Sequence, residues 1–278
     1  MANLNIVFMF FCSLLLVVVV SGNTYPFCSK IQLPPGVTGP ESAAFDAAGG
    51  GPYVSVTDCR VLKWDSTLNV FVEFAYTAPN RCREGSLANI VDIRNKQLCD
   101  GTTDPNMGPI CGRPLGLSFY YATGFLYIVD AYFGFLVVGP QGGLALQLAT
   151  SAEGVPFKFT DGVDVDQQSG LVFFTHASET FNLWNATQPG FKPDSTGRLL
   201  KYDPVTKQVI VLLRGLAGAG GAASTSGLRI NGLGKLLGTL PLVKGYFNAS
   251  IAVVQEQNSA LYIGSRDTDF LGVFKKGP

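Results

Sequence analysis

Residues 99–143 read CDGTTDPNMGPICGRPLGLSFYYATGFLYIVDAYFGFLVVGPQGG and give the strongest indication of the fold. This stretch contains three strand-like runs separated by turns rich in Gly, Pro and Thr, at residues 115–120, 125–129 and 135–138. Gly, Pro and polar residues between short apolar runs are typical of tight turns. The runs leave no room for a helix between them, so the stretch predicts an antiparallel sheet of short strands.

The pattern recurs further along the chain. Gly116 and Gly162 begin similar runs 46 positions apart, and Gly124 and Gly170 begin similar runs at the same offset. An all-β repeat of this length is the signature of a propeller blade of about four antiparallel strands. The sequence therefore predicts an all-β fold, a β-propeller, in which the remaining strand-like runs form further copies.

Composition agrees with an all-β fold. The chain has 278 residues, of which 14% are charged and 12% aromatic, with 33 Gly and 16 Pro. Many glycines and prolines suit a protein of many short strands and turns. The formal net charge is zero and there is no basic run, which argues against a nucleic-acid partner. We expect a single propeller domain over residues 23–278, and a monomer.

The amino terminus resembles a secretory signal. Residues 6–20 are almost wholly apolar, and small residues follow at 21–22. The run is short for a membrane span of about 20 residues, so we expect residues 1–22 to be a cleaved signal peptide. No stable membrane span remains after cleavage; an uncleaved anchor is the alternative. Either outcome places the chain in the secretory pathway, where disulfides persist.

Five cysteines follow the signal, so at least one has no partner within the chain. Cys99 and Cys111 form the best local pair, because the loop between them is short and rich in turn residues. Two free buried thiols are the alternative. Pairing among Cys28, Cys59 and Cys82 stays open.

Two sequons, at Asn185 and Asn248, are candidate N-glycosylation sites. Asn185 lies in a long polar loop and is the stronger candidate, whereas Asn248 precedes a strand.

Six segments resemble signatures of the strictosidine synthase-like proteins of plants. They are GPESAAFD (39–46), CGRPLGL (111–117), LYIVDAYFGFLVVGPQGG (126–143), QLATSAEGVPFKF (147–159), TGRLLKYDP (196–204) and ALYIGS (260–265). The resemblance implies a six-bladed propeller, with the conserved region at about residues 111–203 and a disulfide matching Cys99–Cys111. It also implies a vacuolar or extracellular address and a relation to lyases of alkaloid biosynthesis.

Two departures from that family bear on function. Its founding enzyme condenses tryptamine with secologanin in a Pictet–Spengler reaction and uses one Glu as acid and base. The matching position here is Ala252, while Glu256 matches a later acidic position. About one blade is missing near residues 226–227, so we expect about five blades in an incomplete or distorted ring.

Five residues are candidates for a ligand pocket. Aromatic side chains occur where the family's amine pocket is aromatic, and Asp161 is placed to hold a cationic amine. His176, the only histidine in the chain, ends a strand that approaches the axis. The candidates are Tyr132, Phe157, Phe159, Asp161 and His176, and for each the alternative is ordinary blade packing or loop chemistry.

No cofactor is expected, and a calcium site is the alternative. Glu41, Asp130 and Asp164 recur near strand ends, and carboxylates that converge on a propeller axis could hold Ca²⁺. Turn chemistry explains the same acidic residues without a metal.

The sequence favours a strictosidine synthase-like protein without Pictet–Spengler activity, which binds a small molecule, with an aromatic amine as the candidate, or is a non-catalytic family member. One alternative is a metal-assisted esterase or lactonase on the same propeller. The other is a genuine strictosidine synthase, which Ala252 disfavours because alanine cannot transfer a proton.

Overall fold

The computed structural model describes residues 27–79, 81, 98–219, 226–230, 236–241 and 252–275. Strands make up nearly all of the regular structure in these segments, and the helices are single turns: η1 (Pro105–Met107), α2 (Gly108–Cys111) and α3 (Leu183–Ala186). None of the helices in these segments has the length and apolar composition needed to cross a bilayer. The all-β prediction is confirmed.

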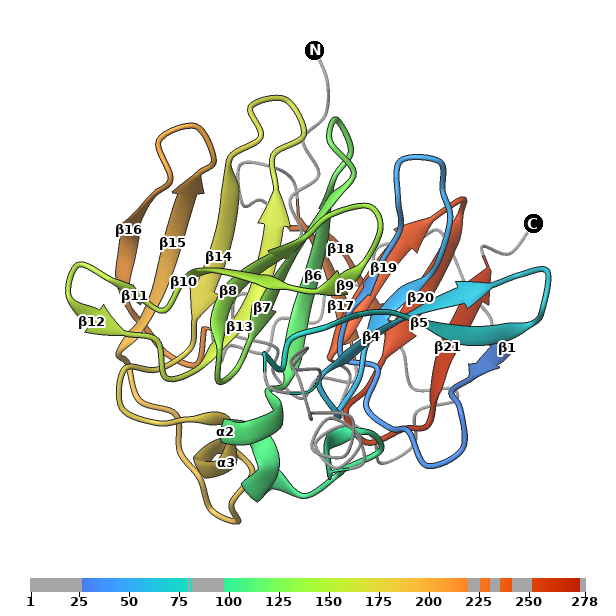
Figure 1. Ribbon diagram of the computed structural model, residues 1–278, viewed down its shortest axis with the longest axis horizontal. Helices are drawn as coiled ribbons and strands as arrows, with labels where there is room; N and C mark the ends of the chain where they lie inside the picture. The colour runs from blue at the N-terminus through green and yellow to red at the C-terminus, as the bar shows by residue number, and fades with distance from the viewer. Residues whose placement is uncertain are drawn as a thin grey trace, which may run out of the picture.

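Four sheets of antiparallel strands, which we call blades, form the body of the molecule (Figure 1). The first contains β2 (Ala43–Ala44), β3 (Tyr53–Ser55), β4 (Arg60–Asp65) and β5 (Val70–Tyr76). The second contains β6 (Pro114–Tyr120), β7 (Phe125–Asp130), β8 (Gly134–Val138) and β10 (Leu146–Ala149). The third contains β13 (Thr160–Val165), β14 (Val172–His176), β15 (Gly197–Asp203) and β16 (Gln208–Leu216). The last contains β19 (Val253–Gln257), β20 (Ala260–Gly264), β21 (Phe270–Lys275) and β1 (Phe27–Gln32).

The repeat detected in the sequence corresponds to two neighbouring blades. Gly116 lies in β6 and Gly162 in β13, and each strand stands at the inner end of its sheet. β6 contacts β13 on one side and β2 and β3 on the other, while β2 contacts β19. The inner strands of successive blades are therefore neighbours, which is the arrangement of a β-propeller.

Apolar cores lie between the blades. One cluster joins the first and second blades through Tyr53, Phe119 and Leu126, and another joins the second and third through stacked Phe135 and Phe174, whose ring centroids are 4.5 Å apart. Each blade buries a face against its neighbour, so the packing between blades, rather than any single sheet, stabilises the fold.

The chain ends meet in the last blade. β1 pairs antiparallel with β21, so an amino-terminal strand completes a sheet whose other three strands come from the carboxy-terminal part. β9 (Gly143–Leu144) pairs in parallel with β5 and covers the outer edge of the first blade, where exposed backbone groups would otherwise be open to pairing with another chain.

Two hairpins accompany the blades. β11 (Ser151–Ala152) pairs with β12 (Val155–Pro156), and β17 (Ser226–Ile230) pairs with β18 (Leu236–Pro241). The β17–β18 hairpin stands in sequence between the third and last blades, where the sequence predicts a missing blade. The described residues thus form four complete blades and one two-stranded hairpin at the place of a further blade.

We predict that Gly264→Ala disrupts the junction between the first and last blades. A Cβ atom at Gly264 would lie 2.0 Å from the carbonyl oxygen of Pro40, a backbone atom that cannot move aside alone. We expect a loss of about 2–3 kcal/mol in the free energy of unfolding, measured by urea denaturation. Gly139→Ala is the matched control, because the nearest atom to its Cβ would be 3.6 Å away. Equal denaturation midpoints for the two variants would contradict the tight junction.

Candidate functional site

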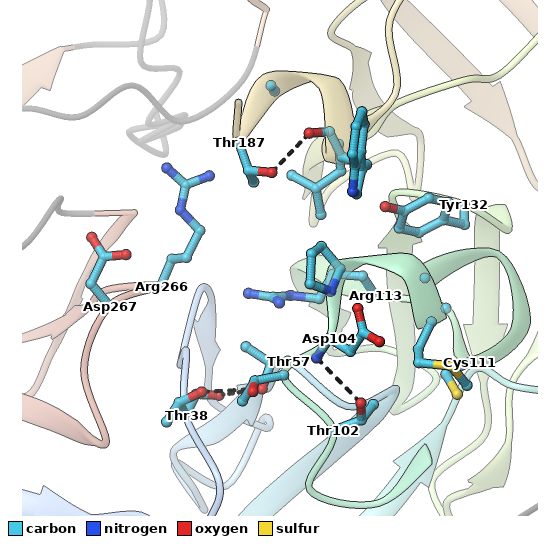
Figure 2. Close-up of a pocket in the computed structure, with 18 residues that line it drawn as sticks. Thr38, Thr57, Thr102, Asp104, Cys111, Arg113, Tyr132, Thr187, Arg266 and Asp267 are labelled. Carbon is cyan, nitrogen blue, oxygen red and sulfur yellow. Dashed lines mark hydrogen bonds between the residues drawn. The ribbon is translucent and has the colours of Figure 1, made fainter. Parts of the chain in front are cut away.

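A pocket of about 440 Å³ opens at one end of the blades, a volume that suits a small molecule (Figure 2). Loops from all four blades contribute to its wall, together with η1, α2 and α3. Figure 1 shows α2 and α3 together at the same end of the strands. The wall has polar residues from the loops and apolar residues from the helices and the turn after β7. The polar ones include Thr38, Thr57, Arg113 and Arg266, and the apolar ones include Met107, Tyr132, Leu183 and Trp184.

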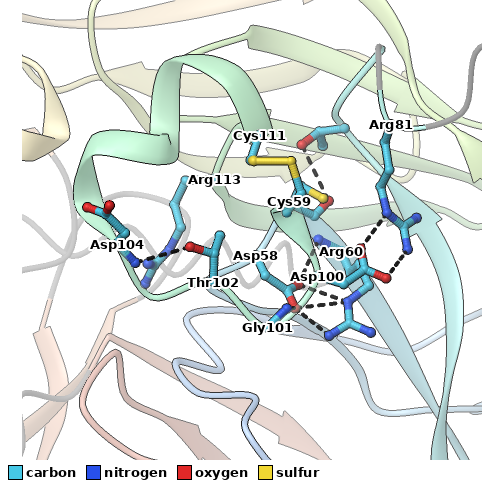
Figure 3. Close-up of a disulfide and its surroundings, with 12 residues drawn as sticks. Asp58, Cys59, Arg60, Arg81, Asp100, Gly101, Thr102, Asp104, Cys111 and Arg113 are labelled. Carbon is cyan, nitrogen blue, oxygen red and sulfur yellow. Dashed lines mark hydrogen bonds and ion pairs between the residues drawn. A yellow bond between two sulfur atoms is a disulfide. The ribbon is translucent and has the colours of Figure 1, made fainter. Parts of the chain in front are cut away.

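A disulfide closes the loop that carries η1 and α2. Cys99 and Cys111 are bonded, with their Cα atoms 5.4 Å apart, and both are buried beside Cys59 and Ala78 (Figure 3). The predicted pair is confirmed. Closing a loop of this length stabilises the fold by about 3 kcal/mol in the loop-entropy account. Cys59 is a free thiol with no exposed surface, and its burial raises the pKa of the thiol, so it is an inert side chain in the folded protein.

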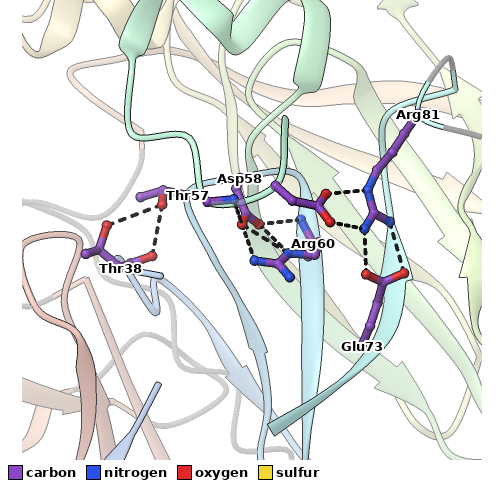
Figure 4. Close-up of polar contacts among 8 residues, drawn as sticks. Thr38, Thr57, Asp58, Arg60, Glu73 and Arg81 are labelled. Carbon is purple, nitrogen blue, oxygen red and sulfur yellow. Dashed lines mark hydrogen bonds and ion pairs between the residues drawn. The ribbon is translucent and has the colours of Figure 1, made fainter. Parts of the chain in front are cut away.

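Ion pairs attach the same loop to the first blade (Figure 4). The fully buried guanidinium of Arg81 donates to both carboxylate oxygens of Asp100, at 2.6 and 2.8 Å, and to both of Glu73, at 3.0 and 2.6 Å. Asp58 accepts a hydrogen bond from the backbone N–H of Gly101 at 2.6 Å. Bidentate pairs of this kind constrain the orientation of both partners as well as pairing their charges. They therefore hold Asp100, next to Cys99, at a defined position relative to β5.

Asp130, at the end of β7, holds the other side of the pocket. Its side chain is completely buried and accepts four hydrogen bonds: from the Thr77 hydroxyl at 2.6 Å and from the backbone N–H groups of Arg113, Tyr132 and Phe133 at 2.8, 2.9 and 3.0 Å. Burial raises the pKa of Asp130, and these donors oppose the rise. One carboxylate therefore positions the backbone of two pocket residues, Arg113 and Tyr132.

We predict that Asp130→Asn destabilises the fold by about 2–3 kcal/mol, measured by urea denaturation. Asparagine keeps the volume, but its NH₂ group would face at least one backbone N–H in either orientation, and a buried donor would lose its acceptor. Asp203→Asn is the control: Asp203 ends β15 at a turn and accepts from the backbone N–H of Val205, which an asparagine oxygen can also do, so the denaturation midpoint should stay unchanged. An unchanged denaturation midpoint for Asp130→Asn would contradict the claim that this carboxylate holds the pocket backbone in place.

Tyr132 is the one predicted pocket residue that lines this cavity. Its ring packs so closely on α2 that a Cβ atom at Gly108 would lie 2.2 Å from it. Burial raises the pKa of its phenol, and a hydrogen bond that the phenol oxygen accepts from the backbone of Trp184 in α3 opposes that rise. Tyr132 therefore joins the two helices and offers a ligand its ring rather than a proton.

The other predicted aromatic residues lie in packing positions. Phe157 is buried in the core of the third blade, with its ring centroid 5.6 Å from that of Phe174. Phe159 packs against the cluster around Leu115 and Leu183, beneath the pocket rather than in its wall. Asp161 is partly buried and does not line the pocket.

His176 is fully buried, and both of its ring nitrogens face protein donors. The backbone N–H of Lys158 donates to Nε2 at 2.9 Å, and Nη2 of Arg198 lies 2.9 Å from Nδ1. Burial, and then the charge of Arg198, lower the pKa of His176 to about 3. The imidazole is neutral at physiological pH and packs inside the third blade.

His176 predicts a specific pH dependence of stability. Its pKa in the folded state lies below the value of about 6.5 in an unfolded chain, so the unfolded chain takes up a proton that the folded chain does not. Stability should fall by about 2 kcal/mol between pH 7.5 and pH 5. Because this is the only histidine, His176→Gln should flatten that slope in urea denaturation measured across the range. An identical slope in the variant would contradict the low pKa.

The three candidate calcium ligands do not converge. Glu41 accepts from Arg113 at 2.9 Å, Asp130 is satisfied by the four donors above, and Asp164 accepts from Ser118 and from the backbone of Val165. Across the part of the chain that the structure describes, no group of three or more His, Cys, Asp or Glu gathers as a metal site. Each of these three carboxylates therefore accepts hydrogen bonds from neighbouring protein groups.

Asn185 lies in α3 rather than in an irregular loop. Its side-chain oxygen accepts from the backbone N–H of Asn182, and the Asn182 side chain accepts from the backbone N–H of Asn185. The sequon thus forms a capping box at the pocket rim. Asn248, Cys28 and Cys82 lie outside the residues whose side chains the structure describes.

Ala252 directly precedes β19 in the last blade and is not among the residues that line the pocket. Its backbone N–H donates to the carbonyl of Gly264 at 3.0 Å, and Arg266, two residues after Gly264, lines the pocket. The position matched to the family's acid–base residue therefore pairs with a strand whose following loop reaches the pocket wall.

Arg113, Trp184 and Arg266 were not predicted as pocket residues. Only Arg113 lies inside a signature segment, and Arg266 directly follows one.

Comparison with known proteins agrees with this architecture. The strictosidine synthase family model matches residues 161–228. This match overlaps the region expected from the motifs, about residues 111–203, and extends past its carboxy-terminal end. A gluconolactonase from Xanthomonas campestris has a similar fold, with a TM-score of 0.53 at 11% identity, covering 92% of this chain and all of that one. This likeness supports the β-propeller fold, and the class of protein that the structure defines is a β-propeller with a loop-lined pocket.

The chain belongs to the strictosidine synthase-like family. It is 45% identical over 203 residues to protein strictosidine synthase-like 10 of Arabidopsis thaliana, covering 73% of this chain and 50% of that protein. It is 39% identical over 202 residues to strictosidine synthase of Catharanthus roseus, covering 71% of this chain and 53% of the enzyme. The chain thus spans about half the length of these relatives.

Proposed function

We propose that this protein is a small-molecule-binding member of its family that does not catalyse the Pictet–Spengler condensation. The observation that carries the proposal is Ala252, which the sequence resemblance matches to the family's acid–base Glu. General acid–base catalysis contributes about 10²–10⁴-fold, so the loss of the group is sufficient to remove useful turnover. The pocket itself, with about 440 Å³ and an aromatic wall, supports retention of ligand binding.

No other described residue supplies an obvious replacement. The acidic residues of the pocket wall are Asp104 and Asp267, and both are exposed. Asp104 accepts from the backbone and side-chain amides of Asn106, at 2.9 Å each, and so begins η1. His176 is buried away from the pocket wall and has a depressed pKa.

We further propose a monomer in the secretory pathway, in the vacuole or outside the cell. The Cys99–Cys111 disulfide supports an oxidising compartment, as does the apolar amino-terminal run.

The direct test incubates the purified protein with tryptamine and secologanin and follows product by mass spectrometry. We expect no product above the protein-free reaction. Ala252→Glu and its isostere Ala252→Gln then test the position. Turnover by the Glu variant alone would show that residue 252 is the vacant acid–base position, because only Glu can transfer the proton.

Product from the unmodified protein would overturn the proposal. A parallel assay with aryl esters, with and without calcium, addresses the hydrolase alternative. Calcium-dependent ester turnover would favour that alternative. The arrangement of Glu41, Asp130 and Asp164, which all accept hydrogen bonds from protein groups, does not favour it.

A further inference from the structure

The pocket wall has an apolar side and a cationic side. Tyr132, Trp184 and Leu183 form the apolar side, and Leu183 and Trp184 belong to α3. Arg113 and Arg266 come from loops of two different blades. Figure 2 shows both guanidinium groups pointing into the space between these loops and α3. Such a division predicts a ligand with an apolar body and a polar group of defined charge.

Arg266 is an arginine without a carboxylate partner. Five other arginines of the described chain form ion pairs within it: Arg60, Arg81, Arg113, Arg198 and Arg214. Arg266 is half-buried in the pocket wall, and the described residues offer it no such pair. A half-buried guanidinium with free donors is a recognition group for carboxylate or phosphate.

Arg113 is only partly satisfied. Its Nη2 donates to Glu41 at 2.9 Å, and its side chain is 14% exposed. Its Nε is the one buried side-chain nitrogen or oxygen of the described residues that has no hydrogen-bond partner. The backbone of this residue is held by Asp130, so the guanidinium is presented from a fixed anchor.

Gly39 lies between the side chain of Arg113 and the backbone of the Arg266 loop. A Cβ atom at this position would lie 3.1 Å from Nη2 of Arg113 and 3.1 Å from the carbonyl oxygen of Arg266. The loops that carry the two arginines are thus neighbours in the pocket wall. The Arg266 carbonyl is an acceptor, so an anionic ligand would accept from the two guanidinium groups rather than from this backbone.

Glu41 offsets the charge of Arg113 through their 2.9 Å ion pair, whereas no described carboxylate pairs with Arg266. Asp104 is committed to the first turn of η1, and Asp267 is exposed. In Figure 2 the Asp267 carboxylate lies on the far side of Arg266 from Arg113.

We propose that the pocket binds a small aromatic carboxylate, with its carboxylate group between Arg113 and Arg266 and its ring against Trp184 and Tyr132. This inference rests on the proposed small-molecule-binding function and names the class of ligand. It differs from the aromatic amine that the sequence favours, because an ammonium group would meet the guanidinium of Arg266, which has no carboxylate partner among the described residues. Bidentate donors match a carboxylate in shape as well as in charge.

The test measures binding of three probes with the same ring by isothermal titration calorimetry: phenylacetate, its methyl ester and phenethylamine. We expect phenylacetate to bind at least about tenfold more tightly than either of the others, since a charge-assisted hydrogen bond is worth a factor of that order. Arg266→Gln should weaken phenylacetate binding by about tenfold or more and leave the affinity for the ester unchanged.

Arg214→Gln is the matched control, because Arg214 lies on the exposed outer strand β16 and pairs with Glu153. Urea denaturation of both variants establishes that they are folded. Arg113→Lys, which keeps the charge facing Glu41 but loses the fork, should also weaken phenylacetate binding.

Equal affinity for phenylacetate and its ester, or affinity unaffected by Arg266→Gln, would overturn the carboxylate assignment. Binding of phenethylamine alone would overturn it too, while leaving the small-molecule-binding function intact. If none of the three probes binds at millimolar concentration, both proposals are contradicted.

Discussion

The carboxylate of Asp130 is the constraint on which the pocket depends. It ends β7 and is completely buried, and it receives donors from the loop before β6, from the turn after β7 and from the loop that follows β5. Burying a charge is unfavourable unless it is hydrogen-bonded, and here four donors surround it. Because three of them are backbone groups, the carboxylate fixes main-chain positions, and Arg113 and Tyr132 take their places in the pocket wall from it.

The disulfide loop adds a second set of constraints around that centre. The Cys99–Cys111 disulfide closes the loop of residues 99–111 on itself, and the Arg81 ion pairs and the Asp58–Gly101 hydrogen bond attach this loop to the first blade. η1 and α2 therefore cover the pocket without a long helix to stabilise them. Helices of one turn have little intrinsic stability. Their position therefore follows from covalent and ionic links and from the packing of Tyr132 on Gly108.

Ligand binding and proton transfer place different demands on this propeller. The blades, the disulfide loop and the aromatic wall form a pocket with two arginines at its polar end, and the position that the resemblance matches to the family's acid–base Glu holds Ala252. Binding requires shape and complementary charge, whereas proton transfer requires one group of suitable pKa at one place. A scaffold can keep the first and lose the second through a single residue.

The sequence by itself determined the all-β propeller, the strand runs at 115–120, 125–129 and 135–138 and the Cys99–Cys111 pair, because strand period, turn residues and loop closure are local properties. It did not determine which side chains share the pocket. Phe157 lies inside a signature segment and His176 ends a strand expected to approach the axis, yet both are buried inside the third blade. Arg266 lies in the pocket although it only follows a signature segment. Those placements depend on how loops from different blades meet at one end, and only the tertiary structure decides that.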